Sequence, residues 1–190
     1  MKNINKVFIS LAIVATTLMT TLCYSESGKA PSPATPDIRY TFLKDCHETV
    51  ANENAAYSIL ACPDLAGFKV SITKQSPQYF NILLTTNNSE ISSDFTAATN
   101  ENPIKEGKAI EWHIVDKVPK FMVFRLSWGS DDKPNDMSEY LLVNLVSKDS
   151  ICVLAAIDTK KNKNANEKAH SLILNEFKQT DTCQYKILKY

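Results

Sequence analysis

Residues 109–128 read AIEWHIVDKVPKFMVFRLSW. Two runs in this stretch, Ala109–Asp116 and Phe121–Trp128, alternate apolar and other side chains, which is the period of a half-buried β-strand. In the first run the face opposite the apolar one carries Glu111, His113 and Val115. The apolar faces of the two runs collect Ile110, Trp112 and Ile114, and Met122, Phe124, Leu126 and Trp128.

Further strands are expected on both sides of this stretch. Turn residues such as Pro63 and Gly67 bound them, and the polar segment 148–150 suits a hairpin connection. The polar segments Asn87–Asn102 and Gly129–Asp136 are expected to be an exposed connection and a loop. The remaining predicted strands are Ala56–Ala61, Phe68–Thr73, Tyr79–Thr85, Glu139–Val146 and Ile151–Ile157.

One helix is predicted near the end of the chain, from Asn164 to Gln179. Asn164 or Asn166 can cap it, and Glu167 in the first turn suits the positive end of the helix dipole. Its apolar stripe consists of Ala165, Ala169, Leu172, Ile173 and Phe177. The sequence therefore predicts an α+β fold, in which an antiparallel sheet of about six or seven strands carries this C-terminal helix on one face.

The N-terminal region predicts export. Residues 1–25 resemble a cleaved signal peptide, with Lys2 and Lys6 before an uncharged run that is too short to span a bilayer. Residues 26–37 form a Pro/Ser-rich linker, and residues 38–190 form a single domain. Lipid anchoring through Cys23 is a less favoured alternative, because Leu22 stands where a small residue is usual. The expected location is periplasmic or secreted.

Four cysteines remain after removal of the signal peptide. An even number in an exported chain indicates two disulfides, for which three pairings are possible. We favour Cys46–Cys62 and Cys152–Cys183, because each pair encloses one local unit. No two cysteines have the close spacing typical of a zinc site, so the sequence predicts no metal and no cofactor.

The cysteine framework and its neighbours resemble a family of small exported proteobacterial proteins of unknown function. The similar segments span roughly Cys46 to Cys183, and they consist of residues with structural roles. They consist of Cys46, Cys62-Pro63, Gly67-Phe68-Lys69-Val70, Cys152-Val153, Ala155-Ala156-Ile157-Asp158, an Asn/Ala-rich helix start and a final cysteine. The resemblance implies no particular activity.

Motifs for catalysis are mostly missing. The chain lacks the hydrolase elbow, HExxH and CxxC, and its four glycines and zero net charge argue against phosphate loops and nucleic-acid binding. Glu111 and His113 share a strand face and can bind a metal or relay a proton, although a solvated sheet face is the favoured interpretation. His170 is expected at the border of the helix stripe, and His47 lies beside Cys46. The basic cluster, of which three lysines lie in a loop just before the predicted helix, is interpreted as solvated; it consists of Lys160, Lys161, Lys163 and Lys168.

These observations favour a binding or inhibitory module of the cell envelope or the secreted space over an enzyme. Its partner would be a protein or an envelope component, not a nucleic acid, and no transmembrane segment is expected after signal removal. One alternative is an envelope enzyme that uses Glu111 and His113. Another is a secreted host-interaction factor, since the same signal also feeds export beyond the cell.

Overall fold

The computed structural model describes residues 36–52, 57–75, 79–99, 104–130, 133–183 and 186–190. These residues belong to the unit Ala34–Tyr190. The predicted signal peptide, Cys23 and nearly all of the predicted linker lie outside the described residues. No helix in the described part of the chain is long and apolar enough to cross a membrane.

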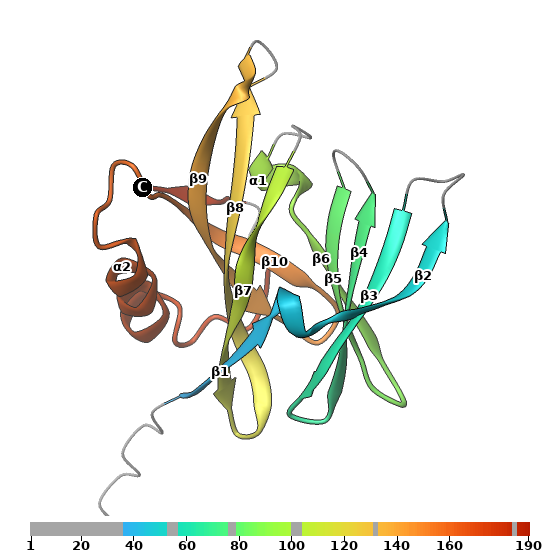
Figure 1. Ribbon diagram of the computed structural model, residues 1–190. Coiled ribbons are helices and arrows are strands. Elements are labelled where there is room, and N and C mark those ends of the chain that lie inside the picture. Colours follow the sequence, from blue (N-terminus) through green and yellow to red (C-terminus); the bar gives the residue numbers. More distant parts are fainter. Residues whose placement is uncertain (1–35, 53–56, 76–78, 100–103, 131–132, 184–185) are drawn as a thin grey trace, which may run out of the picture. The chain divides into compact units, whose positions relative to one another are not determined.

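Eleven strands within the described residues form one curled sheet (Figure 1). The strand order is β1-β7-β8-β9-β10-β6-β5-β4-β3-β2, with β11 added beside β10. The strands are β1 (Asp37–Phe42), β2 (His47–Asn52), β3 (Tyr57–Leu65), β4 (Phe68–Gln75), β5 (Tyr79–Thr85), β6 (Glu90–Asp94), β7 (Ile104–Val115), β8 (Val118–Ser130), β9 (Lys133–Val146), β10 (Ile151–Asp158) and β11 (Leu188–Lys189). Neighbouring strands are antiparallel, except that β10 runs parallel to both β6 and β11.

The predicted α+β fold with six or seven antiparallel strands is therefore wrong: the fold is mostly β, and its sheet is mixed. The strands that the prediction missed are β1, β2, β6 and β11, which have between two and six residues each. Strand β6 and the one-turn helix α1 (Thr96–Thr99) lie in the segment predicted to be an exposed connection. The predicted loop 129–136 is also shorter than expected, because β8 and β9 extend into it. A short 3-10 turn, η1 (Leu43–Asp45), connects β1 to β2.

The C-terminal helix is α2 (Ala165–Ser171), which continues as the π-helical turn η2 (Leu172–Glu176) and ends before the predicted Gln179. Asn164 stands at the N-cap position, but its side chain forms no capping hydrogen bond. The predicted stripe is confirmed: Ala165, Ala169, Leu172, Ile173 and Phe177 are all buried.

Two apolar cores use opposite faces of the sheet. The inner core lies inside the curl and contains Trp112, Met122 and Phe124, as the alternation predicted. The outer core lies between α2–η2 and strands β8–β10, on the side of these strands away from β2–β6 (Figure 1). Strand β10 supplies both cores, which explains why its sequence is almost continuously apolar.

Both predicted disulfides are confirmed. Cys46–Cys62 joins the residue after η1 to β3, and it ties the β1–β2 connection to the second half of the sheet. Cys152–Cys183 joins β10 to the segment after η2. The second bridge therefore fastens the chain beyond the helix to the strand that the helix covers.

The β7–β8 turn offers a test of local backbone strain. Asp116 and Lys117 both have positive φ, +50° and +67°, in a two-residue hairpin loop that favours glycine at its second position. We expect Lys117→Gly to raise the free energy of unfolding by about 0.5–1 kcal/mol, because the relief of left-handed strain exceeds the entropy cost of glycine. Urea unfolding measures this change. Lys148→Gly is the matched control: Lys148 lies in another hairpin turn without positive φ, and an equal gain there would contradict the explanation.

Candidate functional site

Strand β7 places Glu111 and His113 on the outer face of the sheet, since the residues between and beside them point inward. Ile110 and Trp112 are fully buried in the inner core. On the outer face, Glu111 pairs with Val123 of β8. His113 lies deeper, with 3% of its side chain exposed, against 16% for Glu111.

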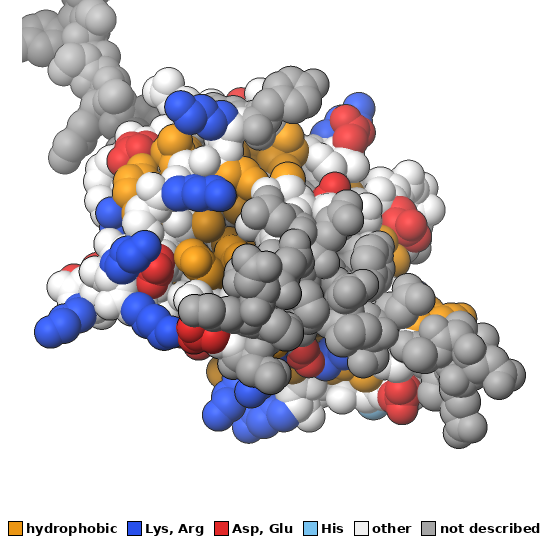
Figure 2. Space-filling view, turned by 90° about the horizontal axis from the view of Figure 1, so that it is seen from above, with side chains coloured by type: hydrophobic (Ala, Val, Ile, Leu, Met, Phe, Trp, Pro, Cys, Tyr) orange, Lys and Arg blue, Asp and Glu red, His pale blue; other side chains and the backbone are white. Residues whose placement is uncertain are grey.

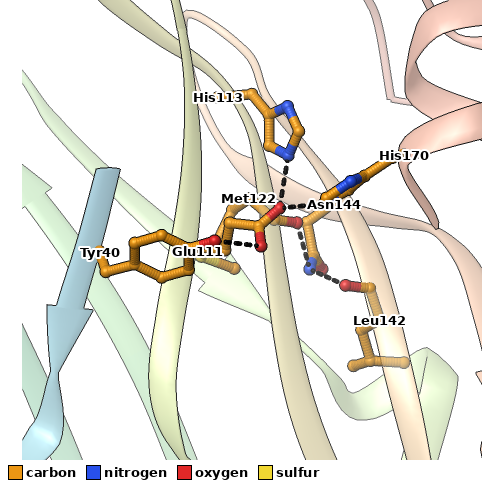
Figure 3. Close-up of polar contacts among 7 residues, drawn as sticks. All are labelled: Tyr40, Glu111, His113, Met122, Leu142, Asn144 and His170. Atoms are coloured by element: carbon orange, nitrogen blue, oxygen red, sulfur yellow. Dashed lines mark hydrogen bonds and ion pairs between the residues drawn. The ribbon is translucent and has the colours of Figure 1, made fainter. Parts of the chain in front are cut away.

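Helix α2 brings a third functional side chain, His170, to this pair. Ala169 is buried in the outer core, so the next residue, His170, points toward the edge of the surface where the helix packs on the sheet. The Nε2 atoms of His113 and His170 each lie 2.7 Å from Oε1 of Glu111 (Figure 3). The two imidazole rings meet edge to face, with centroids 5.3 Å apart. The prediction that His170 borders the stripe was correct, but no spacing in the sequence indicated that it meets Glu111.

Tyr40 completes the group from the other side. It lies on β1 directly opposite Glu111 in the strand register, and its hydroxyl donates a 3.0 Å hydrogen bond to Oε2 of Glu111 (Figure 3). Sequence reasoning did not predict β1 as a strand, so it missed this residue. The alternation of Ile38, Tyr40 and Phe42 was the available signal. We call Tyr40, Glu111, His113 and His170 the Glu–His cluster.

Glu111 is a carboxylate at every physiological pH. Burial by itself raises the pKa of Glu111, but the hydrogen bonds from His113 and His170, the charge of His170 and the hydrogen bond from Tyr40 outweigh it and lower the pKa to about 2. A carboxylate can only accept hydrogen bonds, so the Nε2 atoms of both histidines act as donors in this arrangement.

Because Nε2 of His113 donates a hydrogen bond, the tautomer of the neutral ring is fixed. In the neutral ring Nδ1 is then an unprotonated acceptor, and it is buried without a hydrogen-bond partner among the described residues. Protonation of this ring would bury an N–H without an acceptor.

Three of these residues form a potential metal-ligand set. One ligand atom from each of Glu111, His113 and His170 lies within 4.8 Å of the other two. Two imidazole nitrogens and a carboxylate oxygen are a ligand set that zinc and neighbouring transition metals accept. Binding of a metal ion would break the hydrogen bonds from the two histidines to Glu111. The proton of each imidazole would then move from Nε2 to Nδ1.

The other candidates from the sequence do not join this group. His47 is exposed at the start of β2. Of the four lysines of the basic cluster, Lys161 in the loop forms an ion pair with Asp158, and Lys168 in α2 lies over the Tyr190 ring. The cluster is therefore engaged partly in contacts within the chain. On the face shown in Figure 2, acidic and apolar side chains lie beside lysine and arginine side chains.

Comparisons with protein-family models, curated protein sequences and solved structures found no match to this chain. The resemblance to small exported proteobacterial proteins stays a prediction.

The low pKa of Glu111 predicts a stability change in acid. Because its folded pKa, about 2, lies below its ordinary value of 4.5, its contribution is fully present above pH 4.5 and is lost as the pH falls toward 2. The loss is on the order of 3 kcal/mol. Urea unfolding of the wild type and of Glu111→Gln between pH 6 and pH 2 measures it.

The comparison with Glu111→Gln is needed because Glu106, paired with Lys74, and Asp158 also have lowered pKa values. The titration of Glu106 and Asp158 changes the stability of the wild type and of Glu111→Gln equally. The difference in unfolding free energy between wild type and variant should therefore shrink as the pH falls. A difference that stays constant over this range would show that the ionised Glu111 does not stabilise the fold.

Proposed function

We propose that the protein is an exported binding protein that takes up a divalent transition-metal ion at Glu111, His113 and His170. The observation that carries this proposal is the convergence of both Nε2 atoms on one carboxylate oxygen, at 2.7 Å each. Export is supported by the N-terminal sequence and by the two disulfides, which form in oxidising compartments.

The ligand set favours a particular class of ion. Imidazole suits zinc, copper and nickel, whereas calcium and magnesium prefer sites made of oxygen ligands. Imidazole binds a metal ion in its neutral form, so the bound ligand set would carry the single negative charge of Glu111, which favours a dication over a monovalent cation. Three protein ligands leave at least one coordination position for water or another molecule.

The surroundings of the site permit exchange with solvent. His170 has 38% of its side chain exposed, so an ion can reach the cluster from the margin of the helix. The second shell is incomplete, because Nδ1 of His113 has no acceptor among the described residues. We therefore expect weaker binding than in structural zinc sites with four protein ligands.

We favour binding over the catalytic alternative for Glu111 and His113. Glu111 and His113 are mostly buried, with 16% and 3% of their side chains exposed, and they hydrogen-bond to each other. A catalytic role needs room for a substrate beside the reacting groups.

Zinc titration of the untagged mature chain tests the proposal. Isothermal titration calorimetry should show one zinc ion per chain. Glu111→Gln and His170→Ala should each weaken binding about 10-fold or more, because each removes one of three ligands. A thermal scan with and without zinc should show a rise in Tm for the wild type that is smaller for both variants.

His47→Ala is the matched control, since His47 is an exposed histidine outside the cluster. This variant should bind zinc as the wild type does. Equal losses in His47→Ala and His170→Ala would indicate unspecific surface binding. Absence of binding by the folded wild type would overturn the proposal.

A further inference from the structure

We infer that Tyr40 is a positioning residue that restricts Glu111 to one metal-binding oxygen and thereby keeps one coordination position of the ion exchangeable. This inference rests on the metal site proposed above. It assigns a role to a side chain that does not itself contact the ion.

The two oxygens of Glu111 have separate partners. Oε1 faces both imidazoles, at 2.7 Å from each Nε2 atom. Oε2 accepts the hydrogen bond from the Tyr40 hydroxyl, at 3.0 Å. Carboxylates bind metal ions through one oxygen or through both, and a hydrogen bond to the second oxygen favours the first mode.

Several contacts hold the Tyr40 hydroxyl in this place. Tyr40 and Glu111 are direct cross-strand partners in the pairing of β1 with β7. The Tyr40 ring stacks on Phe42, with centroids 6.1 Å apart. On the other face of β1, Thr41 accepts a 2.9 Å hydrogen bond from the buried Trp112 indole. The strand that carries Tyr40 is therefore anchored to the inner core at the adjacent residue.

The coordination number follows from this arrangement. With Oε1, two Nε2 atoms and one water, the ion has four ligands, the number that zinc prefers. Without the Tyr40 hydroxyl, Oε2 is free to approach the ion as a fifth ligand. It would then occupy space that an exchangeable ligand needs, and the site would bind external molecules less well.

Cobalt(II) reports this difference, because four-coordinate cobalt absorbs visible light more strongly than five- or six-coordinate cobalt. The experiment compares the cobalt-loaded mature wild type with Tyr40→Phe, which removes only the hydroxyl. We expect strong visible bands for the wild type and bands at least twofold weaker for Tyr40→Phe, at the same stoichiometry. Added azide should shift the wild-type spectrum and should leave that of the variant nearly unchanged.

Tyr190→Phe is the matched control, because it removes a tyrosine hydroxyl that lies outside the Glu–His cluster, against Glu176. Its cobalt spectrum should resemble that of the wild type. Circular dichroism and Tm verify that all three proteins are folded, so that a spectral change reports the site.

Three results would overturn the inference. Identical cobalt spectra and azide responses for wild type and Tyr40→Phe would show that the hydroxyl does not set the coordination. A phenolate-to-metal charge-transfer band in the copper(II)-loaded wild type, lost in Tyr40→Phe, would make Tyr40 a ligand instead of a positioning residue. No cobalt or zinc binding by the wild type would overturn the proposed function, and this inference with it.

Discussion

Burial of both faces of strands β8–β10 is the constraint on which the rest of the structure depends. Their inner faces fill the curl of the sheet, so their outer faces need a separate cover against water. Helix α2 and η2 provide it, and the Cys152–Cys183 bridge and strand β11 fasten the following chain to β10. Because α2 must lie on this face, His170 at its margin comes within reach of β7.

The parts of the fold that the sequence predicts are those with a strong local period. Alternation around Trp112 correctly separates the two faces of β7, and the period of the helix identifies all five buried residues of its stripe. Edge strand β1 alternates over only six residues, and its apolar side chains Ile38, Tyr40 and Phe42 are exposed, so the pattern does not mark a core face. Edge strand β2 is stabilised by its pairing with β3. The size of the sheet and its parallel contacts at β10 are tertiary properties that no local pattern contains.

The same distinction applies to the candidate site. Glu111 and His113 are two residues apart on a strand, so their common face follows from the sequence. Their meeting with His170, which is 59 residues from Glu111, depends on how the helix is placed across the sheet. The contact with Tyr40 depends on the register of β1, a strand that the sequence did not reveal. The sequence interprets Glu111 and His113 as part of a solvated sheet face. Only tertiary packing joins them with two further residues into the Glu–His cluster.

Both carboxylate oxygens of Glu111 accept hydrogen bonds within the protein, and this affects how strongly the proposed site can bind a metal ion. Glu111 already accepts three hydrogen bonds, and a metal ion must replace the two from His113 and His170. Hydrogen bonds to a charged group contribute about 1.5–3 kcal/mol each, so their loss offsets about 3–6 kcal/mol of the metal–ligand free energy. Because these hydrogen bonds stabilise the folded state, we expect the chain to fold without an ion at the proposed site, unlike a zinc finger, whose folding requires the ion. Reversible uptake, with the hydrogen-bonded cluster as the resting state, suits this energetic balance better than a permanent structural metal.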